Sequence, residues 1–185
     1  MNLTDLQIDR GWTLFLDRDG VINKKIENDY VRNLEMFEWI DGSKEAIVSL
    51  SKIFEKIIVV TNQQGIGKEL MTEEDLNEIH SYMKSEVENS GGRIAAAYYS
   101  PHLKEENNSM RKPGTGMLLK AKQDFPEIEF AKSIMVGDSI SDMEMASKLR
   151  LYKVWVGEDI PDYINADFHF KKLFDFSKAV YKIEI

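Results

Sequence analysis

The stretch Trp12-Thr13-Leu14-Phe15-Leu16-Asp17-Arg18-Asp19-Gly20-Val21 joins an apolar run to two carboxylates that stand two positions apart. Such a run predicts a buried strand, and ligands of an open α/β sheet bind at the carboxyl ends of its strands. Asp and Gly are also common turn residues. The stretch alone therefore fits either a turn or a catalytic pair, in which one Asp accepts a phosphoryl group and the other transfers protons.

Apolar runs alternate with helical patterns along the rest of the chain. The most regular helical pattern covers residues 73–90 and follows Thr72-x-x-Asp75, which is typical of a capping box. Strands separated by helices predict an α/β fold, a doubly wound, Rossmann-like parallel sheet with helices on both faces. The predicted strands are 13–16, 56–60, 94–99, 133–136, 152–156 and a weaker 166–170, and the other predicted helices are 43–54, 116–125, 142–149 and 172–180.

Length and composition favour one globular domain over residues 1–185, with 43% hydrophobic and 30% charged residues. No apolar stretch approaches the ~20 residues that span a bilayer, and residues 1–7 do not read as a secretory signal. We therefore expect no membrane contact and a cytoplasmic location. The net charge of −8 disfavours a nucleic-acid partner. A small anionic substrate remains compatible with it, provided that local cations or a metal offset the acidic charge.

Three further polar segments follow predicted strands. Each segment has an ordinary explanation. The first, residues 61–67, reads as a loop with a Thr cap or as a cradle of backbone amides for an oxyanion. The second, residues 111–114, reads as a solvated basic pair. In the third, Ser141-x-x-Glu144 resembles a capping box, and Asp142 would then favour the helix N-terminus. The segments are Thr61-Asn62-Gln63-Gln64-Gly65-Ile66-Gly67, Arg111-Lys112-Pro113-Gly114 and Gly137-Asp138-Ser139-Ile140-Ser141-Asp142.

Together the four segments place carboxylates, a hydroxyl, an amide and two cations at one edge of the predicted sheet. Oxygen ligands without cysteine suit Mg²⁺. A lysine and a hydroxyl suit phosphoryl oxygens. The combination is what metal-assisted phosphoryl transfer through an aspartyl phosphate requires.

In this order the segments resemble the four motifs of the haloacid dehalogenase superfamily. The resemblance extends from about Leu14 to Leu149 and is closer to one branch, the D-glycero-D-manno-heptose 1,7-bisphosphate phosphatases. The histidinol-phosphate phosphatases share much of the pattern. The segments that carry the closer resemblance are Asp17-Arg18-Asp19-Gly20-Val21-Ile22-Asn23, Thr61-Asn62-Gln63-Gln64-Gly65-Ile66, Tyr98-Tyr99-Ser100-Pro101-His102, Arg111-Lys112-Pro113-Gly114 and Met117-Leu118-Leu119.

The resemblance implies a role for each catalytic residue. Asp17 would attack phosphorus and become phospho-aspartate. Asp19 would protonate the leaving alcohol and then activate water, which favours turnover of phosphate esters over storage of the phospho-aspartate. Thr61 would hold phosphoryl oxygens, and Lys112 would neutralise charge shared with the nucleophile.

The resemblance also implies binding roles. Asn62, through its backbone, and Gln63 would contact substrate. Arg111 would hold the part of the substrate beyond the scissile phosphate, since a guanidinium suits a hydroxyl or a second phosphate. The residues that would coordinate Mg²⁺ are Asp17, Asp138 and, through its backbone carbonyl, Asp19. For Asp142, a water-mediated metal contact and a capping role stay open.

Two features separate this chain from some relatives. The intervals between the motifs leave no room for a large cap domain, so we expect an open site framed by the loops 23–39 and 100–109. The heptose and histidinol phosphatases often carry a zinc loop with a Cys-x-His pair followed by a Cys-x-Cys pair. Here Ser100 replaces the first cysteine, His102 remains, and the chain has no cysteine. A single His does not build a tetrahedral zinc site, so we expect no structural zinc.

The sequence thus predicts a Mg²⁺-dependent phosphomonoesterase of a small phosphorylated metabolite, such as D-glycero-D-manno-heptose 1,7-bisphosphate. A histidinol-phosphate phosphatase, a nucleic-acid 3′-phosphatase and a non-catalytic phosphate-binding module are the alternatives. The intact pair of Asp17 and Asp19 disfavours the last. We expect structural or solvated roles for His80 and His169. Lys24 and Lys25 would form a solvated pair or help to attract an anion. No residue pattern indicates an oligomeric state.

Overall fold

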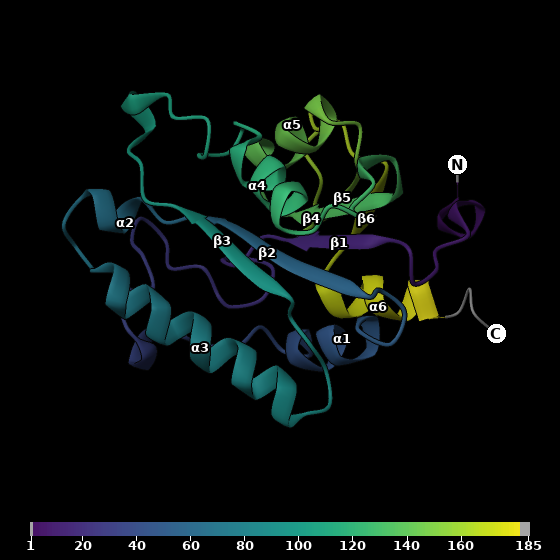
Figure 1. The fold of residues 1–185 in the computed structure, drawn as a ribbon, viewed down its shortest axis with the longest axis horizontal. Coiled ribbons are helices and arrows are strands. Elements are labelled where there is room, and N and C mark those ends of the chain that lie inside the picture. Colours follow the sequence, from purple (N-terminus) through teal and green to yellow (C-terminus); the bar gives the residue numbers. More distant parts are fainter. Residues whose placement is uncertain (1, 182–185) are drawn as a thin grey trace.

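Strand β1 (Thr13–Leu16) lies between β2 (Lys56–Asn62) and β4 (Ser133–Gly137) in a six-stranded parallel sheet (Figure 1). The order is β3-β2-β1-β4-β5-β6, which confirms the predicted doubly wound α/β fold. The computed structural model describes residues 2–181. The other strands are β3 (Ala96–Ser100), β5 (Tyr152–Val156) and β6 (Phe168–Phe170), and the α-helices are α1 (Ser43–Leu50), α2 (Gln64–Gly67), α3 (Glu73–Asn89), α4 (Gly116–Asp124), α5 (Ile140–Lys148) and α6 (Leu173–Tyr181).

The side chains of β1 alternate between two apolar layers, as a strand covered on both faces requires. Leu14 and Leu16 join the cluster that packs under α1, α3 and α6. Phe15 joins the cluster under α4 and α5. Figure 1 shows α4 and α5 on one side of the sheet and α1, α3 and α6 on the other. Because all three side chains are fully buried, the carboxyl end of β1 is held firmly at the sheet edge.

The segment between β1 and α1 forms a long loop that rests on α3. Val31 packs in a third apolar cluster with Met71, Leu76 and Ile79, and Tyr99 adds to it. The backbone of this loop also pairs with itself through an isolated bridge between Asn23 and Trp39. Residues 23–39 therefore form a packed wall beside the sheet edge, and no additional cap domain interrupts residues 2–181.

The predicted elements are all present, but several boundaries differ. The capping box of α3 is confirmed, since the Thr72 hydroxyl accepts a bond from Asp75 N and the Asp75 carboxylate accepts one from Thr72 N. Helix α1 ends at Leu50, earlier than predicted, because residues 51–53 form turns. Strand β3 begins two residues later than predicted.

The predicted capping box at Ser141-x-x-Glu144 is wrong. Helix α5 begins two residues earlier, with Ser139 at the N-cap and Asp142 as its reciprocal partner. The Asp142 Oδ2 atom accepts bonds from Ser139 N (3.2 Å) and Ser139 Oγ (2.6 Å). The error arose because the same segment contains two serines, and each is followed three residues later by an acid.

Residues 64–67 form the short helix α2 where an open loop was predicted. A Cβ at Gly67 would lie 2.5 Å from the carbonyl oxygen of Pro101, so this glycine permits close packing against the protein's own backbone. One interpretation of the sequence was that this segment permits close approach of an oxyanion, and the packing of Gly67 against Pro101 does not support that interpretation. Across residues 2–181, no helix has the length and apolar character to cross a bilayer.

Candidate active site at the carboxyl edge of the sheet

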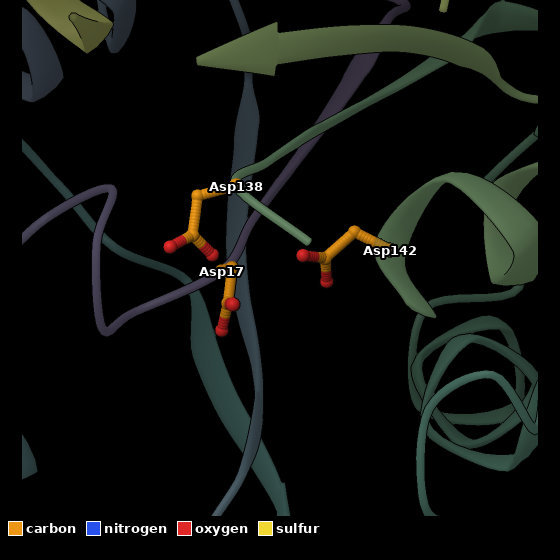
Figure 2. Close-up of side chains that lie close together, drawn as sticks. All are labelled: Asp17, Asp138 and Asp142. Carbon is orange, nitrogen blue, oxygen red and sulfur yellow. The ribbon is translucent and has the colours of Figure 1, made fainter. Parts of the chain in front are cut away.

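Three carboxylates from separate segments meet at the carboxyl edge of the sheet. Asp17 follows β1, Asp138 follows β4 and Asp142 lies in the first turn of α5. A carboxylate oxygen from each lies within 4.8 Å of the others. Figure 2 shows the three side chains gathered around the end of β1. The common edge arises because Leu16 pairs in register with Val136 of β4, and Asp17 N donates to the carbonyl oxygen of Val136 at 2.9 Å.

Lys112 is the buried cation of this site. Its Nζ lies 2.8 Å from Asp17 Oδ1 and 2.6 Å from Asp142 Oδ1, and it donates to the carbonyl oxygen of Val60 at 3.1 Å. An ammonium has three donors, so all three are engaged. Burial alone would lower the pKa of Lys112, but Asp142 and Asp17 raise it above its ordinary value. Lys112 is therefore a fixed positive charge beside Asp17.

The Asp142 side chain combines two functions. One oxygen contacts Lys112 and the other caps α5. The capping role left open by the sequence is thus present, and an ion pair with Lys112 accompanies it. Because both oxygens already have protein partners, Asp142 is placed to position Lys112 from behind the site.

Asp19 is surrounded by donors. The guanidinium of Arg18 forms a fork on it, with NH2 at 3.0 Å from both carboxylate oxygens. Asn23 Nδ2 and Gln63 Nε2 each donate to it at 2.8 Å. Burial would raise the pKa of Asp19, but Arg18, Asn23 and Gln63 together lower it. The resting carboxylate is therefore an anion.

Sequence reasoning missed Arg18, which is fully buried. Its NH1 lies 3.4 Å from His80 Nε2, and burial together with Arg18 lowers the pKa of His80 to about 3. The predicted structural role of His80 fits this place. A charged residue between two carboxylates directly after a buried strand was the available signal, because a buried Arg requires an anionic partner.

The segment after β2 contributes a hydroxyl and two amides. Thr61 is buried and lines the pocket beside Asp17 and Asp19. Gln63 is also buried, and its Nε2 bridges Asp19 Oδ2 and Thr61 Oγ1 at 2.8 and 2.9 Å. Gln63 is absent from the pocket wall among the residues described. This placement does not support its predicted contact with substrate and indicates that it positions Asp19 and Thr61.

Asn62 lines the pocket. Its side chain also forms a reciprocal pair with the backbone of Lys112, because Nδ2 donates to Lys112 O at 3.1 Å and Oδ1 accepts from Lys112 N at 2.9 Å. This pair ties the end of β2 to the segment that carries Lys112. Sequence reasoning missed the contact, since 50 residues separate the two partners.

Asp17, Asp19 and the basic pair of Arg111 and Lys112 line a pocket of about 240 Å³, a size suited to part of a small molecule. The loop 23–39 supplies one wall, as predicted, and Arg111 lies on the wall beside Lys112. Arg111 NH1 donates to His102 O at 3.1 Å. Residues of the loop 100–109 border an adjoining hollow, which Arg111 also lines. The lining residues of the pocket are Asp17, Asp19, Lys25, Ile26, Asp29, Tyr30, Val31, Thr61, Asn62, Arg111, Lys112, Ser139 and Ser141.

The site fits a divalent cation. Asp138 Oδ1 is buried and has no hydrogen-bond partner among the described residues. Burial raises the pKa of Asp17 to about 6, with Asp142 and Asp19 adding to the shift and Lys112 opposing it. Burial and the repulsion from Asp17 raise the pKa of Asp138, and Lys25 and Lys112 oppose that shift. A cation between these two carboxylates would satisfy the free oxygen and relieve the repulsion. The all-oxygen donor set is the one that Mg²⁺ prefers.

Gly20 allows the close approach of Asp138. Its φ of +91° is a left-handed conformation, and a Cβ at this position would lie 2.1 Å from Asp138 Oδ2. The glycine after the two aspartates is therefore needed both for the turn and for the space that Asp138 occupies.

Comparison with known proteins agrees with this geometry. The model of the family described as polynucleotide kinase 3 phosphatase matches residues 14–177. The chain is 42% identical over 135 residues to a D-glycero-alpha-D-manno-heptose-1,7-bisphosphate 7-phosphatase of Mycobacterium bovis, covering 73% of this chain and 71% of the relative. It is 34% identical over 145 residues to a D-glycero-beta-D-manno-heptose-1,7-bisphosphate 7-phosphatase of Photorhabdus laumondii, covering 75% and 76%.

Solved structures share the fold. The D,D-heptose 1,7-bisphosphate phosphatase from B. bronchiseptica, complexed with magnesium and phosphate, aligns with a TM-score of 0.81 and 24% identity over 92% of this chain and 98% of that one. The D,D-heptose 1,7-bisphosphate phosphatase from Burkholderia thailandensis aligns with a TM-score of 0.66 and 26% identity over the same shares. At 24% identity, the similarity to the B. bronchiseptica structure concerns the fold alone.

Proposed function

Because the chain belongs to the D-glycero-D-manno-heptose-1,7-bisphosphate 7-phosphatase family of the haloacid dehalogenase superfamily, we propose that it is a Mg²⁺-dependent phosphomonoesterase that removes the 7-phosphate of a D-glycero-D-manno-heptose 1,7-bisphosphate. One observation carries the proposal. Asp17 and Asp19 share a pocket with the buried Lys112, and Lys112 lies 2.8 Å from Asp17. This is the arrangement that transfer of a phosphoryl group to a carboxylate requires.

Asp17 is the proposed nucleophile. Its Oδ1 accepts bonds from Arg18 N at 2.7 Å and contacts Lys112 Nζ, which leaves the second oxygen for attack. In the first step a bond forms between this oxygen and phosphorus, and the bond from phosphorus to the sugar oxygen breaks. In the second step water attacks phosphorus and Asp17 is released. Lys112 stabilises the carboxylate that leaves, because its charge is fixed beside it.

Asp19 is the proposed acid and base. It gives its proton to the leaving sugar oxygen in the first step and takes one from water in the second. The donors from Arg18, Asn23 and Gln63 favour its anion, which is the form needed as base. The first step needs the protonated form. We propose that the negative phosphoryl group beside Asp19 raises its pKa on binding, as a nearby like charge does.

Asp17, Asp138 and the backbone carbonyl of Asp19 are the residues proposed to hold Mg²⁺. The ion, when bound, supplies charge neutralisation to the phosphoryl oxygens. Thr61 and Asn62 line the pocket and are the residues proposed to hold two of these oxygens. Arg111, on the same wall, is the proposed contact for the rest of the substrate.

A 3′-phosphatase of nucleic-acid ends is the second candidate, because the matching family model carries that description. The chain's net charge of −8 disfavours a long polyanion. Histidinol phosphate remains a third substrate to be tested. The same chemistry would hydrolyse all three kinds of substrate, so the candidates differ only in the alcohol that leaves.

A panel of substrates tests the proposal. Both anomers of the heptose 1,7-bisphosphate, histidinol phosphate and a 3′-phosphorylated oligonucleotide are incubated with Mg²⁺, and kcat/KM is compared. We expect one heptose anomer to give the highest value. A higher value for the oligonucleotide or for histidinol phosphate would replace the proposed substrate, and no turnover of any compound would favour a phosphate-binding module.

A further inference from the structure

Lys25 is a second lysine that reaches the carboxylates from the loop 23–39. Its Nζ lies 3.1 Å from Asp138 Oδ2, and its side chain is 58% exposed. The backbone beside it is fixed, because Asn23 Nδ2 donates to Lys24 O and Lys24 N donates to Glu38 O. Lys25 is thus partly solvated and also contacts a carboxylate of the site, whereas Lys24 contacts Glu38 on the exposed surface.

The two lysines of the pocket differ in how firmly they are held. Lys112 is buried and has three partners, so it stays in place. Lys25 has one carboxylate partner, and its side chain is 58% exposed although Asp138 is only 17% exposed. Because solvent reaches the ammonium, the contact between Lys25 and Asp138 is weaker than the buried contacts of Lys112.

Asp138 is also a proposed Mg²⁺ ligand, and an ammonium at its other oxygen would lie close to a bound divalent cation. Like charges at such a distance repel. Lys25 and Mg²⁺ therefore compete for the same carboxylate. Lys25 also lines the pocket with Asp17 and Thr61, where the phosphoryl group is expected.

We propose that Lys25 is a displaceable counter-ion: its ammonium neutralises Asp138 until Mg²⁺ binds that carboxylate, and the freed ammonium then binds the phosphoryl group in the pocket. The inference rests on the proposed Mg²⁺-dependent function. It assigns the loop 23–39 a role in coupling metal binding to anion binding. The Lys25 side chain would serve both metal binding and anion binding, because a lysine has a compact charge on a long, flexible stem.

Isothermal titration calorimetry of Mg²⁺ binding tests the first half. The variant K25Q removes the competitor, and K24Q is a matched control with the same charge change at a neighbouring lysine that is equally exposed. We expect the Kd of K25Q for Mg²⁺ to fall about two- to fivefold, and that of K24Q to stay close to wild type.

Titration of inorganic phosphate into the Mg²⁺-saturated proteins tests the second half. We expect the Kd of K25Q for phosphate to rise about tenfold, the worth of one charge-assisted hydrogen bond, while K24Q binds as wild type does. Equal Mg²⁺ or phosphate affinities of K25Q and K24Q would overturn the inference alone. Failure of the wild-type protein to bind Mg²⁺ would overturn the proposed function with it.

Discussion

At the scale of single residues, the candidate site separates fixed charges from available ones. Lys112 is held by Asp17, Asp142 and Val60 O, and Asp19 is held by Arg18, Asn23 and Gln63. The free positions are one oxygen of Asp17 and Oδ1 of Asp138, which is buried without a partner. Preorganised charges around an open reacting position are what electrostatic catalysis requires.

Asp17→Asn should reduce kcat by about 10³-fold or more, because the amide is a poor nucleophile. Burial raises the pKa of Asp17, so its charged form lowers the free energy of unfolding. The variant should therefore unfold, in EDTA, at a temperature no lower than that of the wild type. Phosphate release and thermal unfolding are the two measurements. Near-normal turnover would show that another residue attacks phosphorus.

His80 should make stability depend on pH. Its pKa is lowered to about 3 from 6.5, so the folded chain binds fewer protons than the unfolded chain between these values. Its contribution is complete above about pH 6.5 and is lost as the pH falls. Relative to H80Q, the free energy of unfolding of the wild type should fall by up to about 1.4 kcal/mol per pH unit in this window.

Urea unfolding at several pH values between 4.5 and 7 measures this slope. H169Q is the control, because it removes an exposed imidazole and should keep the wild-type slope. Parallel curves for wild type and H80Q would show that His80 takes up its proton equally well in the folded state.

The sequence predicted which residues meet at the candidate site better than it predicted the contacts that hold them. Asp17, Asp19, Thr61, Lys112 and Asp138 lie together, as their positions after strands implied. The contacts of Arg18 with Asp19 and of Asn62 with Lys112 depend on side-chain rotamers and on distant segments. Periodicity and turn signals do not encode such contacts, so they were missed, as were the contacts of Gln63 with Asp19 and Thr61.

At the scale of elements, α2 connects the two loops around the site. Gln64 Nε2 donates to Tyr30 Oη at 3.1 Å, and Gln64 Oε1 accepts from Lys104 N at 2.9 Å. A four-residue helix is too short to show a period in the sequence, which is why residues 64–67 were predicted as a loop. Strands β1, β2 and β4 were predicted more closely, because each is a mostly buried apolar run followed by turn residues.

Gln64→Ala should loosen both loops and raise KM about three- to tenfold with a smaller change in kcat, since the loops border the pocket while the carboxylates stay on the sheet. Tyr30→Phe removes only one of the two bonds and should have a smaller effect. Steady-state kinetics on the preferred substrate distinguishes the two. A loss in kcat with unchanged KM would place the role of Gln64 in the chemical step.

At the scale of the whole molecule, a chain of net charge −8 is proposed to bind an anion beside several carboxylates. The fold makes this feasible by bringing Lys112, Arg111 and Lys25 to one pocket, and Mg²⁺ would complete the balance. The alternation of strands and helices was enough to predict the sheet and its functional edge. The charge balance within the pocket was beyond the sequence, because it depends on which side chains turn inward.

Mg²⁺ should therefore stabilise the folded protein. At a concentration of 100 times Kd, the free energy of unfolding should rise by about 2.7 kcal/mol. D138N should lose most of this gain, whereas D162N, which removes an exposed charge, should keep it. Thermal unfolding with Mg²⁺ or with NaCl of equal ionic strength measures the difference. Equal stabilisation by both salts would indicate screening in place of a metal site.

The proposed removal of the 7-phosphate by attack of Asp17 is tested most directly by ³¹P nuclear magnetic resonance of the reaction with the preferred anomer of D-glycero-D-manno-heptose 1,7-bisphosphate and Mg²⁺. We expect the resonance of the 7-phosphate to disappear while that of the 1-phosphate remains, inorganic phosphate to appear in equal amount, and D17N to leave the spectrum unchanged. Loss of the 1-phosphate, or release of phosphate by D17N at the wild-type rate, would contradict it.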